Sequence, residues 1–215
     1  MTRTRLMGAT TLLALVGASA ALVAGPDRYG HSDRVERHML PAVSTGPMDP
    51  AWSPDGQWIA FSMRGDIWKI PVEGGQAERL TIAPGYHFEP AWSPDGQQIA
   101  ISTDLDGNLD IGLIGTVAAG TIRHITFDQE VDVQPVWSSD GSALYFTSDR
   151  GPRGFGIFRI DLADATGAVA PVVSGIQPAI SPDGTQLAYV AGVRGRPGTG
   201  GIWVKELPDG AERLV

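Results

Sequence analysis

The heptapeptide PAWSPDG at residues 50–56 sets the pattern for most of this chain. It recurs unchanged at residues 90–96, and with substitutions as PVWSSDG at residues 135–141 and as PAISPDG at residues 178–184. Successive copies are spaced by 40, 45 and 43 residues. A period of this length, with several short strands in each repeat, is typical of the blades of a β-propeller.

Each copy of the heptapeptide contains a predicted tight turn. Proline favours the first central position, aspartate tolerates the next, and glycine adopts the positive φ that follows. The serine hydroxyl before them is able to bond to amides of the same turn. The turn residues that this pattern predicts are Asp55, Gly56, Asp95, Gly96, Asp140, Gly141, Asp183 and Gly184.

Four strands are expected in each repeat. The first ends near the tryptophan, and the second is a nearly continuous apolar run after the turn, which indicates a strand covered on both faces. A third strand follows, and a fourth, more polar strand is expected at the outer edge, where charged side chains disfavour pairing with another chain. We therefore predict an all-β fold, a β-propeller with four recognisable four-stranded blades at about residues 47–82, 88–127, 133–173 and 176–215.

These repeats resemble the TolB-type, WD-like propeller repeat of bacterial envelope proteins over residues 47–215. The resemblance implies an envelope role with a protein or peptide partner of the lipoprotein or colicin kind. TolB proteins carry an α/β domain before the propeller, whereas here only residues 25–46 separate the repeats from the N-terminal segment. The family usually has six or more blades, so four blades either close alone or form part of a six- or seven-bladed ring.

Residues 1–24 have the features of a signal peptide. Arg3 and Arg5 precede an apolar run, and small residues at 18–20 and 22–24 offer cleavage sites. The alternative is an uncleaved membrane anchor, because the run is close to the minimum spanning length. Lipoprotein anchoring is excluded, since the chain has no cysteine to acylate. We expect a periplasmic or secreted protein.

Residues 25–46 form a predicted lead-in to the propeller. Shifted by one repeat of 40 residues, the segment 35–40 falls on the outer strand of the first repeat, so it is expected to be an outer strand without three partners. Two explanations are open. Either the chain is the front portion of a longer propeller, or the segment is a linker that matches by chance.

The composition and the motifs limit the classes of partner and of reaction that are expected for this chain. The net charge of −8 disfavours nucleic acid and anionic lipid as partners. There is no Gly-x-Ser-x-Gly elbow and no His-Glu-x-x-His pair, and the four histidines are scattered. We therefore predict neither catalytic residues nor a cofactor for this chain on its own.

One polar residue stands directly before the recurring proline in each repeat. Equivalent positions in a propeller converge on its axis, so these side chains are expected to meet at one mouth of the central channel. Such a group could hold a cation, a water cluster or a basic peptide end, or it could only solvate the channel. The predicted channel-mouth residues are Asp49, Glu89, Gln134 and Gln177, with His87 on the same segment as Glu89.

A second candidate site is a loop with oxygen ligands at alternate positions. Its residues are Asp104, Asp106, Asn108 and Asp110, a pattern similar to a calcium loop. The pattern departs from an EF-hand, because its glycine stands too early and Gly115 stands where the bidentate glutamate belongs. The alternative is an ordinary hairpin between the second and third strands.

Two functions remain. The first is an exported, non-catalytic propeller module that binds a protein or peptide, or gates a substrate, in the cell envelope. The second follows from residues 40–56 and 63–68, which resemble the propeller before the metal-dependent barrel of some secreted amidohydrolases. Similar propellers gate serine peptidases of the prolyl oligopeptidase and tricorn kinds. In that case this chain is a truncated propeller region whose catalytic domain is missing.

Overall fold

The computed structural model describes residues 46–152, 154–192 and 200–215. Within these residues the chain forms four antiparallel sheets of four strands each, one sheet per repeat. This confirms the predicted all-β propeller with four four-stranded blades. In the same residues, no helix is long and apolar enough to cross a bilayer. The predicted signal peptide and the predicted outer strand at residues 35–40 lie outside the described residues.

Strands follow one another across each blade in chain order. Blade 1 contains β1 (Met48–Trp52), β2 (Trp58–Met63), β3 (Asp66–Pro71) and β4 (Glu78–Arg79). Blade 2 contains β5 (His87–Trp92), β6 (Gln98–Thr103), β7 (Asp110–Gly115) and β8 (Arg123–His124). Blade 3 contains β9 (Asp132–Trp137), β10 (Ala143–Gly151), β11 (Gly154–Asp161) and β12 (Val169–Ser174). Blade 4 contains β13 (Ile176–Ile180), β14 (Gln186–Gly192), β15 (Gly200–Glu206) and β16 (Glu212–Leu214).

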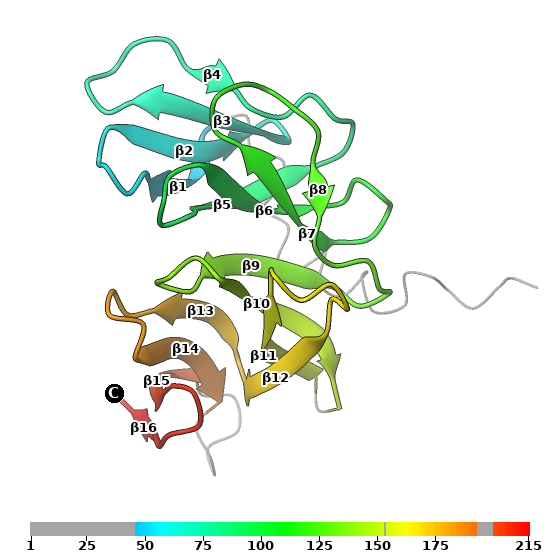
Figure 1. Ribbon diagram of the computed structural model, residues 1–215, viewed down its shortest axis with the longest axis vertical. Helices are drawn as coiled ribbons and strands as arrows, with labels where there is room; N and C mark the ends of the chain where they lie inside the picture. The colour runs from blue at the N-terminus through cyan, green and yellow to red at the C-terminus, as the bar shows by residue number, and fades with distance from the viewer. Residues whose placement is uncertain (1–45, 153, 193–199) are drawn as a thin grey trace, which may run out of the picture.

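Consecutive blades pack face to face around a common axis (Figure 1). The first strands β1, β5, β9 and β13 contact one another in sequence, and β5, β9 and β13 also lie against the second strand of the preceding blade. The core is therefore divided among the three joints between blades. Apolar side chains of β2 and β3 meet those of β6 and β7 in the first joint, for example Ala60 and Ile67 with Ile99 and Ile101.

The second strands have apolar side chains on both faces for this reason. In β6, Ile99 and Ile101 pack toward blade 1, whereas Ala100 packs toward blade 3 against Leu144 and Phe146. All five of these side chains are fully buried. A strand covered on both sides has no solvent face to fill with polar residues, which explains the continuous apolar runs in the sequence.

The SPDG turns share one hydrogen-bond pattern. The Ser53 hydroxyl donates to Oδ1 of Asp55 at 2.6 Å, and the Gln57 N–H donates to the same oxygen at 3.0 Å. The Trp58 N–H donates to Ser53 Oγ at 2.9 Å. These bonds recur in the other three turns. The donated bonds hold the pKa of Asp55 below its ordinary value, and they lower the pKa of Asp140 to about 2.

Candidate functional site

A β-bulge interrupts the first strand of every blade at the polar residue before the recurring proline. These four residues are Asp49, Glu89, Gln134 and Gln177, with φ values of 51°, 52°, 58° and 57°. Positive φ is uncommon outside glycine, and a bulge redirects the side chain it carries. The four residues and the prolines after them line one hollow of about 320 Å³ where the first strands converge.

Hydroxyl groups of the second strands fix three of these side chains within their own blades. Ser62 Oγ donates to Asp49 Oδ2 at 2.9 Å, and Ser102 Oγ donates to Glu89 Oε2 at 2.8 Å. In blade 3, Thr147 Oγ1 donates to Gln134 Oε1 at 2.9 Å. The side chains at the hollow are therefore oriented by bonds made before any ligand arrives.

Two of these side chains also connect neighbouring blades. The backbone N–H of Gln134 donates to Glu89 Oε2 at 2.8 Å, and the backbone N–H of Gln177 donates to Gln134 Oε1 at 3.0 Å. The side chain of one blade thus accepts a bond from the bulge of the next. Glu89 and Gln134 therefore hold neighbouring blades together as well as lining the hollow.

The Glu89 carboxyl is the group at this site with the most altered acidity. Burial raises its pKa to about 7, and the nearby Asp49 carboxylate acts in the same direction. The hydrogen bonds from Ser102 and the Gln134 N–H oppose this rise. A cation placed in the hollow would favour the ionised form of Glu89 and would therefore lower its pKa.

The structure places the His87 side chain elsewhere. His87 is fully buried at the start of β5. Its Nε2 lies 3.3 Å from the Ala83 carbonyl oxygen, which can only accept, so Nε2 carries the proton and donates. Its Nδ1 then accepts from the Thr103 hydroxyl at 2.8 Å. Burial lowers the pKa of His87, and both nitrogens are used inside the protein rather than at the hollow.

The loop predicted to resemble a calcium site directs its side chains to separate partners. Asp104 Oδ1 accepts from the Tyr86 N–H at 2.5 Å, and Asp106 lies 3.5 Å from Nδ1 of His124. The Asn108 amide donates to the Asp128 and Glu130 carbonyls at 3.0 and 2.6 Å. The backbone bond from Gly107 N–H to the Asp104 carbonyl forms the tight turn between β6 and β7.

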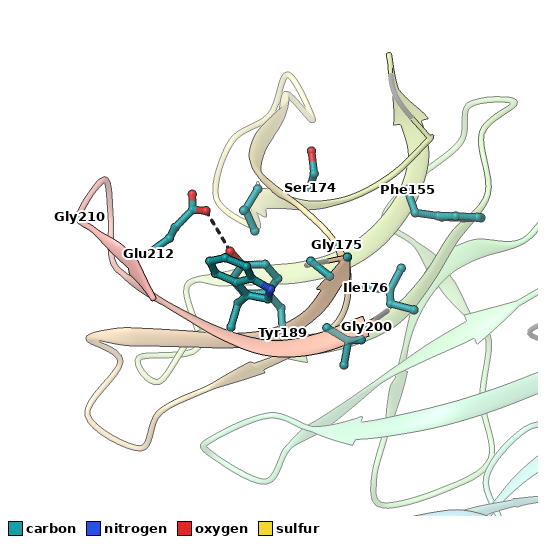
Figure 2. Close-up of a pocket in the computed structure, with 13 residues that line it drawn as sticks. Phe155, Ser174, Gly175, Ile176, Tyr189, Gly200, Gly210 and Glu212 are labelled. Carbon is teal, nitrogen blue, oxygen red and sulfur yellow. Dashed lines mark hydrogen bonds between the residues drawn. The ribbon is translucent and has the colours of Figure 1, made fainter. Parts of the chain in front are cut away.

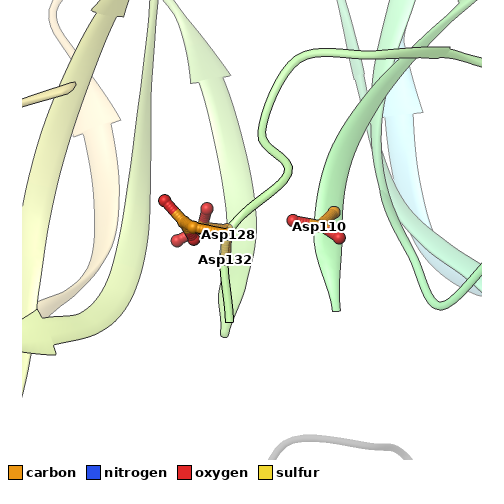
Figure 3. Close-up of side chains that lie close together, drawn as sticks. All are labelled: Asp110, Asp128 and Asp132. Carbon is orange, nitrogen blue, oxygen red and sulfur yellow. The ribbon is translucent and has the colours of Figure 1, made fainter. Parts of the chain in front are cut away.

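Asp110 instead joins a cluster that the sequence did not reveal. It faces Asp128 and Asp132 across the joint between blades 2 and 3 (Figure 3), and one oxygen from each residue lies within 4.8 Å of the others. Arg150 supplies a positive charge here, at 2.7 Å from Asp128 and 2.6 Å from Asp132. Burial raises the pKa of Asp110 to about 7 and that of Asp132 to about 6, although Arg150 opposes the rise at Asp132.

A larger hollow of about 990 Å³ lies between blades 3 and 4. Phe155 and Gly175 line one side, and Tyr189 and Glu212 line the other (Figure 2). The Tyr189 hydroxyl donates to Glu212 Oε2 at 3.1 Å. Among the described residues, its lining combines aromatic surface with the carboxylate of Glu212, and it shares no lining residue with the hollow at the channel mouth.

Solved structures with this fold serve different functions. TolB from Acinetobacter baumannii is 25% identical, with a TM-score of 0.70 over 79% of this chain and 43% of that protein. A puromycin-hydrolysing peptidase from Mycobacterium tuberculosis is 14% identical, with a TM-score of 0.61 over 81% of this chain and 29% of the peptidase. Hydrazine synthase from Kuenenia stuttgartiensis is 16% identical, with a TM-score of 0.58 over 82% of this chain and 51% of that protein.

The match with TolB extends the resemblance found in the repeats to the whole arrangement of blades, so the fold is a TolB-type propeller. This chain spans about half or less of each of the three solved proteins. The two structures below 25% identity show the shared fold alone. Residues 55–199, well over half of the sequence, match the family described as the Tricorn protease N-terminal beta propeller domain, and the chain belongs to that family.

Proposed function

We propose that this chain is an exported β-propeller module that binds a positively charged segment of a protein or peptide at its channel mouth. The observation that carries the proposal is the hollow of about 320 Å³ where four bulged residues meet, two of them acidic. The prolines give the hollow rigid apolar walls, and the carboxylates of Asp49 and Glu89 give it negative charge. Rigid apolar walls with a few oriented polar groups are typical of binding sites.

The envelope location belongs to the same proposal. It is supported by the predicted signal peptide at residues 1–24 and by the resemblance of the repeats to those of bacterial envelope proteins. Expression of the full chain with a C-terminal tag, followed by separation of periplasm, membrane and cytoplasm, tests it. Retention of the full-length chain in the cytoplasm would refute this part of the proposal.

Peptide binding is tested directly with a fluorescent tetralysine peptide and a tetraglutamate peptide as the control. We expect saturable binding of tetralysine only, with affinity that rises with pH as Glu89 ionises around its pKa of about 7. Asp49→Asn should weaken binding, and Glu89→Gln should remove most of the pH dependence. Glu73→Gln removes the same charge from an exposed position of blade 1 and serves as the matched control. Equal binding by all four proteins would refute the proposal.

The second candidate is a substrate-gating propeller that belongs to a hydrolase. It is favoured by the match of residues 55–199 to a propeller described from a protease. In this case the hollow selects substrates for a catalytic domain of the amidohydrolase or serine peptidase kind. Sequencing the transcript beyond the codon for Val215 tests it, because gating requires a catalytic domain in the same reading frame or in a partner protein.

A further inference from the structure

The acidic cluster at the joint between blades 2 and 3 carries more negative charge than its partner neutralises. Asp110 stands at the start of β7, Asp132 at the start of β9 and Asp128 in the segment before β9. One oxygen from each lies within 4.8 Å of the others (Figure 3). Among the described residues, Arg150 is the positively charged partner of Asp128 and Asp132. When all three carboxylates are ionised, the group therefore keeps an excess of negative charge that a divalent cation would balance.

One oxygen of this cluster is buried without a hydrogen-bond partner. The Asp132 side chain is 0% exposed, and its Oδ2 accepts from Arg150 Nη2 at 2.6 Å. Its other oxygen, Oδ1, has no partner among the described residues. Ser148 lies opposite Asp132 in β10 and opposes the rise in the pKa of Asp132 that burial causes, but it makes no hydrogen bond to Oδ1. A buried acceptor without a partner is costly, and a bound ion is one of the groups that satisfy it.

The preceding joint shows that the fold itself does not require three carboxylates here. The positions that correspond to Asp110, Asp128 and Asp132 in the joint between blades 1 and 2 are Asp66, Ala83 and His87. Asp66 pairs with Arg79 at 2.7 Å. The neutral His87 side chain uses both ring nitrogens, on the Thr103 hydroxyl and the Ala83 carbonyl. The first joint is therefore balanced in charge and paired, whereas the second has two additional acidic residues and an unpaired oxygen.

Hydrogen bonds across the joint hold the three carboxylates in place. The Asp132 N–H donates to the carbonyl of Leu109 at 2.8 Å, and Asp110 follows Leu109 directly. The side-chain amide of Asn108 donates to the Asp128 carbonyl at 3.0 Å. Blade 2 therefore fixes the backbone that carries the other two acidic residues. Ligands that are already positioned lose less conformational entropy when they bind an ion.

We propose that Asp110, Asp128 and Asp132 bind one calcium ion between blades 2 and 3. All three ligands are carboxylate oxygens, which favour calcium or magnesium over transition metals. Calcium, with bonds of about 2.3–2.6 Å, spans oxygens that are up to 4.8 Å apart more easily than magnesium, whose bonds are about 2.0–2.1 Å. Water completes the coordination beside Asp128, whose side chain is 40% exposed. This ligand set shares only Asp110 with the loop that the sequence suggested.

Calcium binding is measured by isothermal titration of the full chain after treatment with EDTA, at about pH 8, because metal ligands must be deprotonated. We expect a calcium site that Asp110→Asn and Asp128→Ala each weaken by at least about 10-fold, since changes outside the ligand set alone cost 10–100-fold. Asp128→Ala introduces the residue that the first joint has at this position, so the fold should tolerate it. Asp66→Asn in the first joint and Asp49→Asn at the channel mouth are the controls and should leave this site unchanged.

Urea unfolding with calcium and with EDTA separates binding from folding. Calcium should raise the urea midpoint of the parent protein and of Asp66→Asn, but not that of Asp110→Asn or Asp128→Ala. Circular dichroism in EDTA checks that each variant is folded, and if Asp110→Asn is not, Asp128→Ala decides. No calcium binding by the parent protein, or binding that neither variant weakens, would overturn the proposal. An equal rise with magnesium at the same concentration would overturn the choice of calcium.

Discussion

Replacing Glu89 with glutamine is expected to stabilise the protein at neutral and alkaline pH. Glu89 Oε2 accepts from Ser102 and from the Gln134 N–H, and Gln134 Oε1 accepts the equivalent two bonds in the next blade. A glutamine at position 89 is therefore able to keep both acceptor bonds with the geometry that the protein already uses. What the substitution removes is the negative charge.

The magnitude follows from the pKa of Glu89. Burial raises it from 4.5 to about 7 in the folded protein, so the folded state holds this proton more tightly than the unfolded state. The free energy of unfolding then falls as pH rises through that interval, and the loss is complete above the folded pKa. At 1.36 kcal/mol for each pH unit, ionisation of Glu89 costs about 3 kcal/mol. Glu89→Gln should therefore gain up to about 3 kcal/mol at about pH 8 and almost nothing at about pH 4.

Urea unfolding of both proteins at several pH values between these limits measures the difference in unfolding free energy. Glu73→Gln is the control for loss of a surface charge, since Glu73 is exposed. The difference between Glu89→Gln and the parent protein should grow with pH, whereas the control difference should stay small. A difference that is constant with pH, or a variant less stable than the parent at about pH 8, would refute the assignment of a buried, costly charge to Glu89.

Three further substitutions test the joints between blades, a fourth at an exposed position is their control, and all are measured by urea unfolding. Arg150→Met should lower the unfolding free energy by about 3–5 kcal/mol near neutral pH, because it leaves the buried Asp132 carboxylate unpaired, and the loss should shrink at acidic pH. Gly175→Ala should cost about 1–3 kcal/mol, since its methyl group would lie 2.6 Å from the Tyr189 ring. Ile111→Ala should cost about 2–5 kcal/mol, because Ile111 is fully buried between blades 2 and 3, whereas Ile202→Ala should cost much less, because Ile202 is 57% exposed.

The fold could be predicted because its main determinants are local. The SPDG turn is specified by four adjacent residues whose side chains bond to one another, so the turn is present in the sequence itself. The apolar runs after each turn predict strands covered on both faces, and β6 and β10 have buried residues along most of their length. The repeat then fixes how one blade follows another. Nothing in this reasoning requires knowledge of distant contacts.

The details of the candidate site depend on distant contacts, and the sequence did not supply them. Asp132 and Arg150 are 18 residues apart and meet only because β9 and β10 pair. The sequence predicts His87 at the channel mouth beside Glu89, yet β5 begins there and the imidazole is buried against Thr103. The aromatic residues on both sides of His87 were the available signal that this segment enters the core.

The bulge at the channel mouth decides which acidic residue is available to a ligand. Glu89 and Gln134 have two methylene groups, and each reaches the N–H of the next blade's bulge. Asp49 has one methylene group, and its carboxylate accepts from Ser62 of its own blade through Oδ2. A carboxylate has two acceptor oxygens, so Oδ1 of Asp49 is better placed than the Glu89 carboxylate to meet a cation in the hollow. Glu89 mainly connects blades 2 and 3. Asp49→Asn should therefore reduce peptide binding with little change in stability, and Glu89→Gln should change stability more than binding. If both substitutions changed both quantities equally, this division between joint and binding residue would be wrong.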